Sequence, residues 1–254
     1  MPEVSSYATG QPSWADVTSP DVDAAAKFYS ELFGWKAEKD PRPEAGGYTM
    51  FSRDGKYVAA ASPPPQDGIP PHWSVYLAAD DVDGMAARIR EAGGNVMMEP
   101  FDVFDAGRMT LATDPTGAAF GVWQAGEHIG SQLRGEPGSM NWAEVHTRDK
   151  AAAQAFYEQV FGYETETMDM GGYGGYVLLK VNDQPAAGLL QIGADWGDVP
   201  SNWSVVFQVE DCDGSVAKVQ ELGGSVILEP QDLEGVGRFS VVADPWGAVF
   251  QVVK

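Results

Sequence analysis

The chain has 254 residues, of which 16 are Lys or Arg and 37 are Asp or Glu, giving a formal net charge of −21 at pH 7. This charge disfavours nucleic acid and anionic membrane surfaces as partners. No long apolar run is present, so no transmembrane helix is expected. A single cysteine, Cys212, excludes an internal disulfide, and a signal-peptide pattern is lacking, so we expect a cytoplasmic protein.

The first elements alternate between strand and helix. A strand is predicted from Trp14 to Thr18, and Asp21 is a suitable N-cap for the helix that follows. Gly34 ends this helix, and strands are expected at 47–52 and 57–62 before a proline-rich break. The apolar residues that share one face of the helix are Ala25, Phe28, Tyr29, Leu32 and Phe33.

The same order of elements then recurs. A strand is predicted at 73–79, and Asp81 caps a helix that Gly93-Gly94 terminates. Three strands follow, at 95–98, 109–113 and 118–123. The last two are joined by Asp114-Pro115-Thr116-Gly117, in which Pro fixes the backbone and Gly closes a turn.

Nearly the whole pattern occurs twice. Trp14-Ala-Asp-Val and Trp142-Ala-Glu-Val lie 128 residues apart (142 − 14), and Asp114-Pro and Asp244-Pro lie 130 apart (244 − 114). A repeat of this size is a complete domain. The predicted organisation is therefore one domain at 11–125, a glycine-rich linker at 126–138 and a second domain at 139–254.

The repeated pattern resembles the vicinal-oxygen-chelate superfamily, which includes glyoxalase I, extradiol dioxygenases and bleomycin-resistance proteins. The resemblance rests on the strand–Asp–helix–Phe-Tyr run, the Phe-Gly that ends it, the Gly-Gly step and the closing Asp-Pro-x-Gly turn. The tandem arrangement is also similar to the glyoxalase-like antigens of actinobacteria. The resemblance implies an α+β fold of two tandem glyoxalase-like domains, in each of which two βαβββ modules form a U-shaped sheet around a cavity.

The resemblance also implies where metal ligands would lie. A divalent metal site needs several convergent His or carboxylate donors, and none of the matching positions carries one. We therefore expect no metal ligand and no cofactor. The positions are Trp14 and Trp142 on the first strands, those near Ala60 and Gly188, those near Ser74 and Ser204, and those near Gly121 and Gln251 on the last strands.

Candidate catalytic residues follow from strand alternation, which places every second side chain on one face. Asp16 shares that face with Trp14 in the first domain, and Glu144 and His146 share it with Trp142 in the second. A carboxylate among aromatic walls can have a raised pKa and act as a general acid or base. The alternative is that both carboxylates make structural hydrogen bonds and that His146 only lines a pocket or the surface.

Candidate ligand-binding residues are those that repeat or that line the same faces. Each has a structural alternative: the tyrosines as core residues, the arginines as partners of nearby carboxylates, and His72 at the start of a strand. His128, in the linker, is expected to be solvated. The ligand-binding candidates are Trp14, Trp142, Tyr48, Tyr176, His72, Ser74, Arg108 and Arg238.

Three functions remain open at this stage. The eight tryptophans favour binding of a flat or apolar small molecule without a metal. The second possibility is a glyoxalase-type lyase or isomerase that acts on a small carbonyl compound through Glu144 with His146, or through Asp16. The third is a protein-interaction module with vestigial cavities. The expected partner is a small-molecule ligand or substrate, and the chain is expected to be a monomer or a homodimer.

Overall fold

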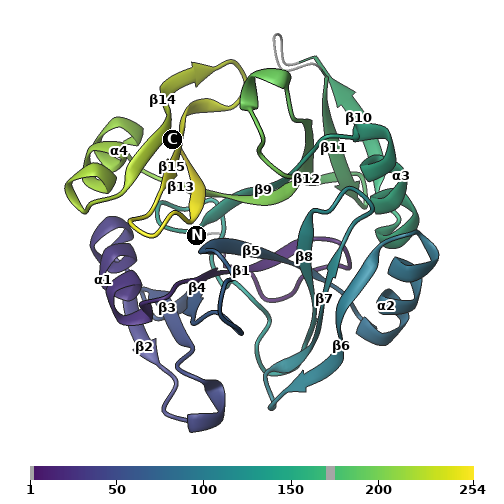
Figure 1. Cartoon of the computed structure of the whole chain (residues 1–254), viewed down its shortest axis with the longest axis horizontal. Coiled ribbons are helices and arrows are strands. Elements are labelled where there is room, and N and C mark those ends of the chain that lie inside the picture. The colour runs from purple at the N-terminus through teal and green to yellow at the C-terminus, as the bar shows by residue number, and fades with distance from the viewer. Residues whose placement is uncertain (1–2, 170–174) are drawn as a thin grey trace.

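A computed structural model of the chain describes residues 3–169 and 175–254. It contains two eight-stranded sheets, one from each copy of the repeat (Figure 1). In the first sheet the strand order is β2-β3-β4-β1-β5-β8-β7-β6, and in the second it is β10-β11-β12-β9-β13-β16-β15-β14. This confirms the predicted α+β fold of two tandem domains, each with two βαβββ modules.

The elements of the first domain include two helices, α1 and α2, and a short 3-10 turn at Pro43–Ala45. Their bounds are β1 Pro12–Thr18, α1 Val22–Phe33, β2 Lys36–Lys39, β3 Thr49–Arg53, β4 Lys56–Ser62, β5 His72–Ala78, α2 Val82–Glu91, β6 Asn95–Val103, β7 Gly107–Thr113 and β8 Ala119–Ala125.

The second domain repeats this order, with a 3-10 turn η3 at Ala194–Trp196 before its fifth strand. The bounds are β9 Met140–Thr147, α3 Lys150–Phe161, β10 Glu164–Met168, β11 Tyr176–Val181, β12 Gln184–Gln191, β13 Asn202–Gln208, α4 Cys212–Glu221, β14 Ser225–Leu233, β15 Gly237–Ala243 and β16 Val249–Val253. None of the helices in the described residues combines the length and hydrophobicity that crossing a bilayer requires.

The helix ends follow the sequence signals. The Asp21 carboxylate accepts a hydrogen bond from the backbone N–H of Ala24 at 2.9 Å, and Asp81 caps α2 through the N–H of Gly84 at 3.0 Å. Gly34 ends α1 with φ of 72°, a left-handed conformation that glycine adopts without steric cost.

Two features of the sheet edges were not predicted from the residues. Strand β2 is short, charged and largely exposed, so it carries no apolar alternation that would reveal it. Strand β6 continues through Pro100, which is tolerated because β6 is an edge strand and its register with β7 shifts between Met98 and Phe101.

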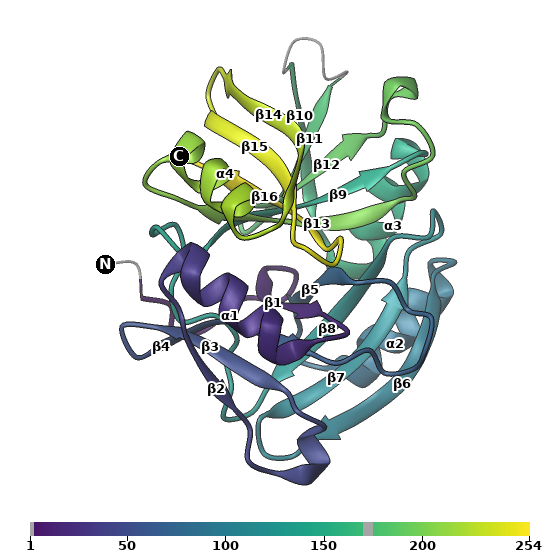
Figure 2. The same ribbon diagram turned by 60° about the vertical axis from the view of Figure 1, so that its left-hand side comes forward.

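The two domains pack directly on one another, with β5 against β13, α1 against α4 and α2 against α3. Figures 1 and 2 both place α4 beside α1 and α3 beside α2, with the helices around the outside of the sheets. Most of the buried hydrophobic residues form one core across both domains, and a separate smaller cluster contains Trp14, Ala60, Tyr76 and Trp123. Phe33 meets Phe207 with ring centroids 5.0 Å apart, and Phe120 meets Tyr157 at 5.9 Å.

Two repeated motifs meet across this interface in a reciprocal pair of hydrogen bonds. The Tyr29 hydroxyl on α1 donates to Asp244 Oδ2 of the other domain at 2.9 Å, and Tyr157 on α3 donates to Asp114 Oδ2 at 3.1 Å. Each hydroxyl also accepts an indole N–H from its own domain, Trp73 at 3.0 Å and Trp203 at 2.7 Å. The Asp-Pro-x-Gly turns therefore join the domains as well as closing hairpins.

Removing either hydroxyl should weaken the association of the two domains. We expect Tyr29→Phe and Tyr157→Phe each to lower the free energy of unfolding by roughly 1–3 kcal/mol, because a buried carboxylate and a buried indole N–H each lose a partner. Urea unfolding followed by tryptophan fluorescence measures the change. Tyr57→Phe, at a ring that is 37% exposed, is the control, and losses no larger than in that control would contradict the assignment.

Candidate functional site

The concave side of each sheet carries the predicted first-strand residues. In the register of β1 with its neighbours, Asp16 lies opposite Ala60 on β4 and Ser74 on β5. In the second domain Glu144 lies opposite Gly188 on β12 and Ser204 on β13. Because residues directly opposite each other share a face, each acidic residue lies on the floor of a curved sheet, on the same face as its Trp.

In domain 1 the floor is a closed network of aromatic side chains around Asp16. The Trp14 indole donates to the Tyr48 hydroxyl at 3.0 Å. Tyr48 and Tyr76 each donate to Asp16 Oδ2, at 3.1 and 3.0 Å. The structure thus brings together the predicted Trp14, Asp16 and Tyr48 and adds Tyr76, which the sequence analysis missed.

Asp16 is held in a setting that disfavours its charge. Burial raises the pKa of Asp16 to about 6, although the hydroxyls of Tyr76 and Tyr48, the nearby His72 and Ser74 act to lower it. The carboxyl therefore titrates just below neutral pH. This agrees with the prediction of a raised pKa for a carboxylate among aromatic walls.

In domain 2 the equivalent network contains a histidine. The Trp142 indole donates to the Tyr176 hydroxyl at 2.7 Å, and Tyr176 donates to Glu144 Oε2 at 2.7 Å. The other oxygen, Oε1, lies 2.9 Å from His146 Nε2 and accepts from Gln251 Nε2 at 2.7 Å. The predicted Trp142, Glu144, His146 and Tyr176 therefore form one connected network.

The charge of Glu144 is stabilised, in contrast to that of Asp16, so the expectation of a raised pKa for a carboxylate among aromatic walls was wrong for Glu144. Burial acts to raise the pKa of Glu144, but the hydrogen bond and charge of His146, together with Gln251 and Tyr176, outweigh it and lower the pKa. Glu144 is therefore ionised at neutral pH. The ionised carboxylate holds His146 with its Nε2 proton directed at Oε1.

The two floors differ because large and small side chains have changed places between two neighbouring strands. Tyr76 lies beside Gly121, where a Cβ would overlap the tyrosine ring. At the twin positions, Val206 lies beside Gln251, so the smaller β13 residue leaves room for the amide that reaches Glu144. Comparing positions 130 residues apart had already paired Gly121 with Gln251, and it could have identified Tyr76 as the twin of Val206 in the same way.

The floor of domain 1 is also more fully covered. Trp14 and Trp123 are only 4% and 7% exposed, whereas Trp142, the twin of Trp14, is half-buried. Tyr48 and its twin Tyr176 are both half-buried. Residue 253, the twin of Trp123, is a valine. Around the first-strand Trp, the concave face of domain 2 is therefore the more open of the two.

The linker contributes to the covering of domain 1. The imidazole of His128 packs edge-on against Trp14, with ring centroids 4.5 Å apart, and against Trp123 at 5.8 Å. Burial lowers the pKa of His128 to about 4, and its Nε2 is buried with no hydrogen-bond partner among the described residues. The expectation that His128 is solvated was wrong, because the linker folds back onto its own domain.

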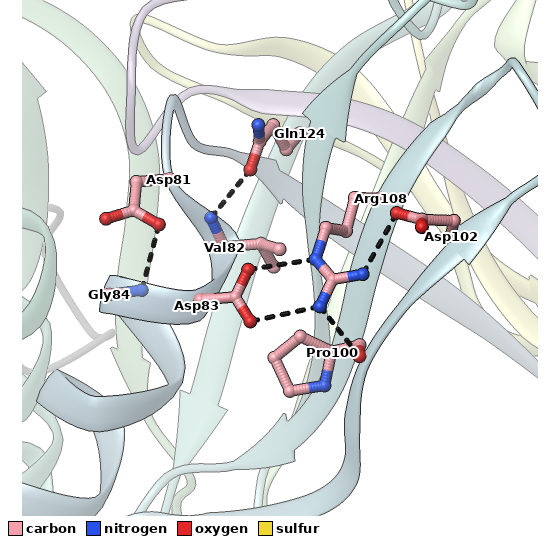
Figure 3. Close-up of polar contacts among 8 residues, drawn as sticks. All are labelled: Asp81, Val82, Asp83, Gly84, Pro100, Asp102, Arg108 and Gln124. Atoms are coloured by element: carbon pink, nitrogen blue, oxygen red, sulfur yellow. Dashed lines mark hydrogen bonds and ion pairs between the residues drawn. The ribbon is translucent and has the colours of Figure 1, made fainter.

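The predicted arginines lie on the other face of each sheet. Arg108 donates to both carboxylate oxygens of Asp83 on α2, at 2.9 and 3.0 Å, and to Asp102 at 2.9 Å (Figure 3). Arg238 makes the equivalent ion pairs with Asp213 and Asp232. The structure thus does not bring either arginine to the concave face, and the ion-pair alternative describes their contacts.

The remaining candidates lie near the ends of the strands or beside the floor. His72 is exposed at the start of β5, with Nδ1 2.8 Å from the carbonyl oxygen of Pro70. Ser74 lies opposite Asp16 and is half-buried. In domain 2 the indole of Trp196, in η3, meets the His146 ring edge-on at 5.2 Å. Trp196 has no twin in the first copy and was missed.

Two hollows on the molecular surface lie apart from the Asp16 and Glu144 networks. The larger, about 410 Å³, is lined by residues of β2, β3, β4 and the β3–β4 turn, including Lys36 and Tyr57. The smaller, about 250 Å³, is lined by Tyr7, Trp123 and Ile129 among others. Neither is lined by Asp16, Glu144 or His146.

Comparison with known proteins agrees with this architecture. The family described as the Glyoxalase/Bleomycin resistance protein/Dioxygenase superfamily matches residues 11–122, and the family described as Glyoxalase-like domain matches residues 142–253. The chain belongs to this superfamily. Each match covers one copy of the repeat.

Relatives in the superfamily match the chain along its whole length. CFP32 of Mycobacterium tuberculosis, whose assignment as a glyoxylase is provisional, is 44% identical over 100% of this chain and 98% of its own. The anthracycline biosynthesis protein DnrV of Streptomyces peucetius is 42% identical over 98% of this chain and 94% of its own.

Solved structures of the superfamily share the fold at low identity. The Mn(II)-bound glyoxalase from Novosphingobium aromaticivorans superposes with a TM-score of 0.66 at 18% identity, covering 96% of this chain and 81% of that one. The 2,2',3-trihydroxybiphenyl 1,2-dioxygenase of Sphingomonas wittichii gives 0.67 at 15% identity, covering 97% and 90%. These similarities support the fold alone.

The positions that carry metal ligands by resemblance hold other groups in this chain. Trp142 and Gln251 are hydrogen-bonded within the Glu144 network, and a Cβ at Gly188 would overlap the Tyr176 hydroxyl. Within residues 3–169 and 175–254, no three His, Cys, Asp or Glu side chains converge as metal ligands would. None of the positions named by the resemblance carries a His or carboxylate side chain.

The opposite pKa shifts of Asp16 and Glu144 predict opposite effects on stability. The pKa of Asp16 rises from 3.8 to about 6 on folding, so the folded state favours the protonated carboxyl. The stability that this gives to the fold is complete below pH 3.8 and is lost as pH rises through 6. We expect Asp16→Asn to gain stability over the wild type across this range, by up to about 3 kcal/mol above pH 7.

The twin substitution, Glu144→Gln, serves as the matched control. The pKa of Glu144 is lowered on folding, so its charged form stabilises the fold at neutral pH, and the variant should lose stability there. Urea unfolding at pH 4 and pH 7.5 measures both. The titration of His128 changes stability in the same pH range with the opposite sign. This change is common to the wild type and both variants, so it cancels in each difference in the free energy of unfolding. A pH-independent effect of Asp16→Asn would contradict the assignment.

Proposed function

We propose that the protein binds a small, planar, carbonyl-containing aromatic molecule on the concave face of domain 2, without the metal ligands usual in the superfamily. The observation that carries this proposal is the pairing of two half-buried aromatic side chains, Trp142 and Tyr176, with the connected Glu144–His146 pair. The equivalent face of domain 1 is filled by its own side chains.

The aromatic residues favour a flat ligand. Trp142 and Tyr176 lie on the floor, and the Trp196 indole lies beside His146 at its margin. Phe239 lies opposite Val253 in the β15–β16 register and is also half-buried. Aromatic faces and edges of this kind bind planar rings through stacked or edge-on contacts.

The polar groups favour a ligand with a carbonyl or hydroxyl group. A pocket that binds small molecules combines apolar walls with a few fixed polar groups that set the orientation of the ligand. Here Glu144, His146 and Gln251 supply these groups within one network. The two relatives named for anthracycline biosynthesis are consistent with this chemistry, because anthracyclines are flat aromatic ketones.

The expectation that binding needs no metal rests on the side chains at the metal-ligand positions. The ligand positions implied by the resemblance are Trp, Ala, Gly, Ser and Gln residues. Three of them, Trp142, Ser204 and Gln251, are already hydrogen-bonded within the Glu144 network. Purified protein should therefore bind the ligand equally well before and after dialysis against EDTA.

Binding is tested with 1,8-dihydroxyanthraquinone as the probe. At 100 times its Kd the probe should add about 2.7 kcal/mol to the free energy of unfolding. Trp142→Phe should weaken binding by about two- to tenfold, because one indole contact is worth about 0.5–1.5 kcal/mol. Fluorescence titration and thermal unfolding provide the two measurements.

The matched control is the same change in domain 1, Trp14→Phe, which should leave the affinity for the probe unchanged. Equal weakening by both substitutions, or no stabilisation by anthraquinones, naphthaldehydes or dicarbonyls, would refute binding in domain 2.

A second candidate function is proton transfer on a small carbonyl compound. The observation that favours it is the 2.9 Å contact between His146 Nε2 and Glu144 Oε1 beside the half-buried aromatic groups. An ionised carboxylate that orients an imidazole leaves that imidazole able to take a proton from a carbon next to a carbonyl and return it to a neighbouring atom.

Turnover of the glutathione hemithioacetal of methylglyoxal tests this candidate. His146→Asn should lower kcat by about a hundredfold or more, since general acid–base catalysis contributes 10²–10⁴ in rate. Thr18→Val, the control at the twin position, should have no effect. Activity that survives both His146→Asn and Glu144→Gln would exclude this mechanism, and so would inactive wild-type protein that still binds the anthraquinone.

A further inference from the structure

Residues 126–130, Gly-Glu-His-Ile-Gly, form a strap across the concave face of domain 1. The N–H groups of Gly126 and His128 donate to the carbonyl oxygen of Ala106, at 2.8 and 3.0 Å, and that of Glu127 donates to Asp105 at 3.0 Å. The Trp123 indole donates to the carbonyl oxygen of His128 at 2.8 Å. The strap is thus tied to the β6–β7 turn and to β8.

The glycines at both ends of the strap are needed for this close approach. A Cβ at Gly126 would lie 2.6 Å from the carbonyl oxygen of Asp105, and one at Gly130 would overlap the carbonyl oxygen of Ser13. Gly130 also has φ of 103°, which other residues rarely adopt. The strap therefore docks in one defined position and has a permissive residue at each end.

The strap places one aromatic ring in a box of other aromatic rings. The His128 imidazole meets Trp14, Trp123 and Tyr57 edge-on, with centroids 4.5, 5.8 and 6.0 Å apart. Its buried Nε2 has no partner among the residues that the structure describes. An unpaired buried nitrogen costs stability, so the ring fits the box by shape while its polar atom is unsatisfied.

The strap is attached weakly enough to open. Gly126 and Glu127 are exposed. In the described part of the chain the strap is held by backbone hydrogen bonds, the Trp123 indole and the His128 ring, without any ion pair. Local opening of such segments is the least costly motion in a folded domain.

We propose that domain 1 has a latent site for a small planar aromatic molecule, with His128 as its built-in occupant, and that the 126–130 strap opens to admit the ligand. The ligand takes the place of the imidazole between Trp14, Trp123 and Tyr57. This site is separate from the one in domain 2, so its failure would leave that proposal unaffected.

The test uses indole as the probe and the His128→Ala variant of the full chain. Removing the ring leaves an aromatic cavity, and apolar cavities of this kind bind small aromatic molecules. Calorimetry in the Trp142→Phe background, which weakens domain 2, should show one indole site with Kd at least tenfold below that of the same protein with His128 intact. Indole should also raise the Tm of the variant.

Two controls separate an opened site from general loosening. Glu127→Ala changes the strap next to His128 but keeps the imidazole between the aromatic rings, so this variant should gain no indole site. His128→Leu refills the box without an unpaired nitrogen, so it should bind no indole and should slow amide hydrogen exchange at residues 126–128. An indole affinity of His128→Ala equal to that of Glu127→Ala would overturn the proposal.

Should His128→Ala fail to fold, exchange in the wild-type chain decides the question. Millimolar indole should then accelerate amide exchange at 126–128 at least threefold while exchange in β1 and β8 stays unchanged. Rates at 126–128 that do not respond to indole would overturn the proposal.

Discussion

The fold depends on the satisfaction of two buried carboxylates by tyrosines of the opposite domain. Asp244 and Asp114 each close a hairpin turn of their own domain and accept a hydroxyl from Tyr29 or Tyr157 across the interface. Buried carboxylates are costly without such donors. The reciprocal pair therefore fixes the orientation of the two domains, and the shared aromatic core packs around it.

This fixed orientation leaves the concave faces free to diverge. The helices and the outer faces of both sheets are committed to the core, so changes there would create cavities or steric overlap. The floors retain the repeated Trp–Tyr–carboxylate chain, but Tyr76 and Gly121 of domain 1 are replaced by Val206 and Gln251 in domain 2. The floor of domain 1 covers Asp16, a carboxyl whose raised pKa lets it become neutral. The floor of domain 2 carries the ionised Glu144 paired with His146.

The repeat made much of this predictable. Strand alternation correctly grouped Trp14 with Asp16, and Trp142 with Glu144 and His146, because successive side chains of a strand point to opposite faces. The arginines were harder to place, since Arg108 is adjacent in sequence to the concave residue Met109 and only the register of β7 with β8 assigns its face. His128 could not be placed because the path of a linker depends on long-range contacts.

The sequence by itself determined the duplicated fold, the capped helices and the inward pairing of each Trp with a carboxylate, all of which follow from local periodicity and comparison of the copies. Only the tertiary structure decided which groups meet across the domains and which face is covered. Tyr29 reaches Asp244, and His128 reaches Trp14, over sequence separations that no local pattern encodes. The pKa shifts of Asp16 and Glu144 likewise depend on neighbours that only folding brings together.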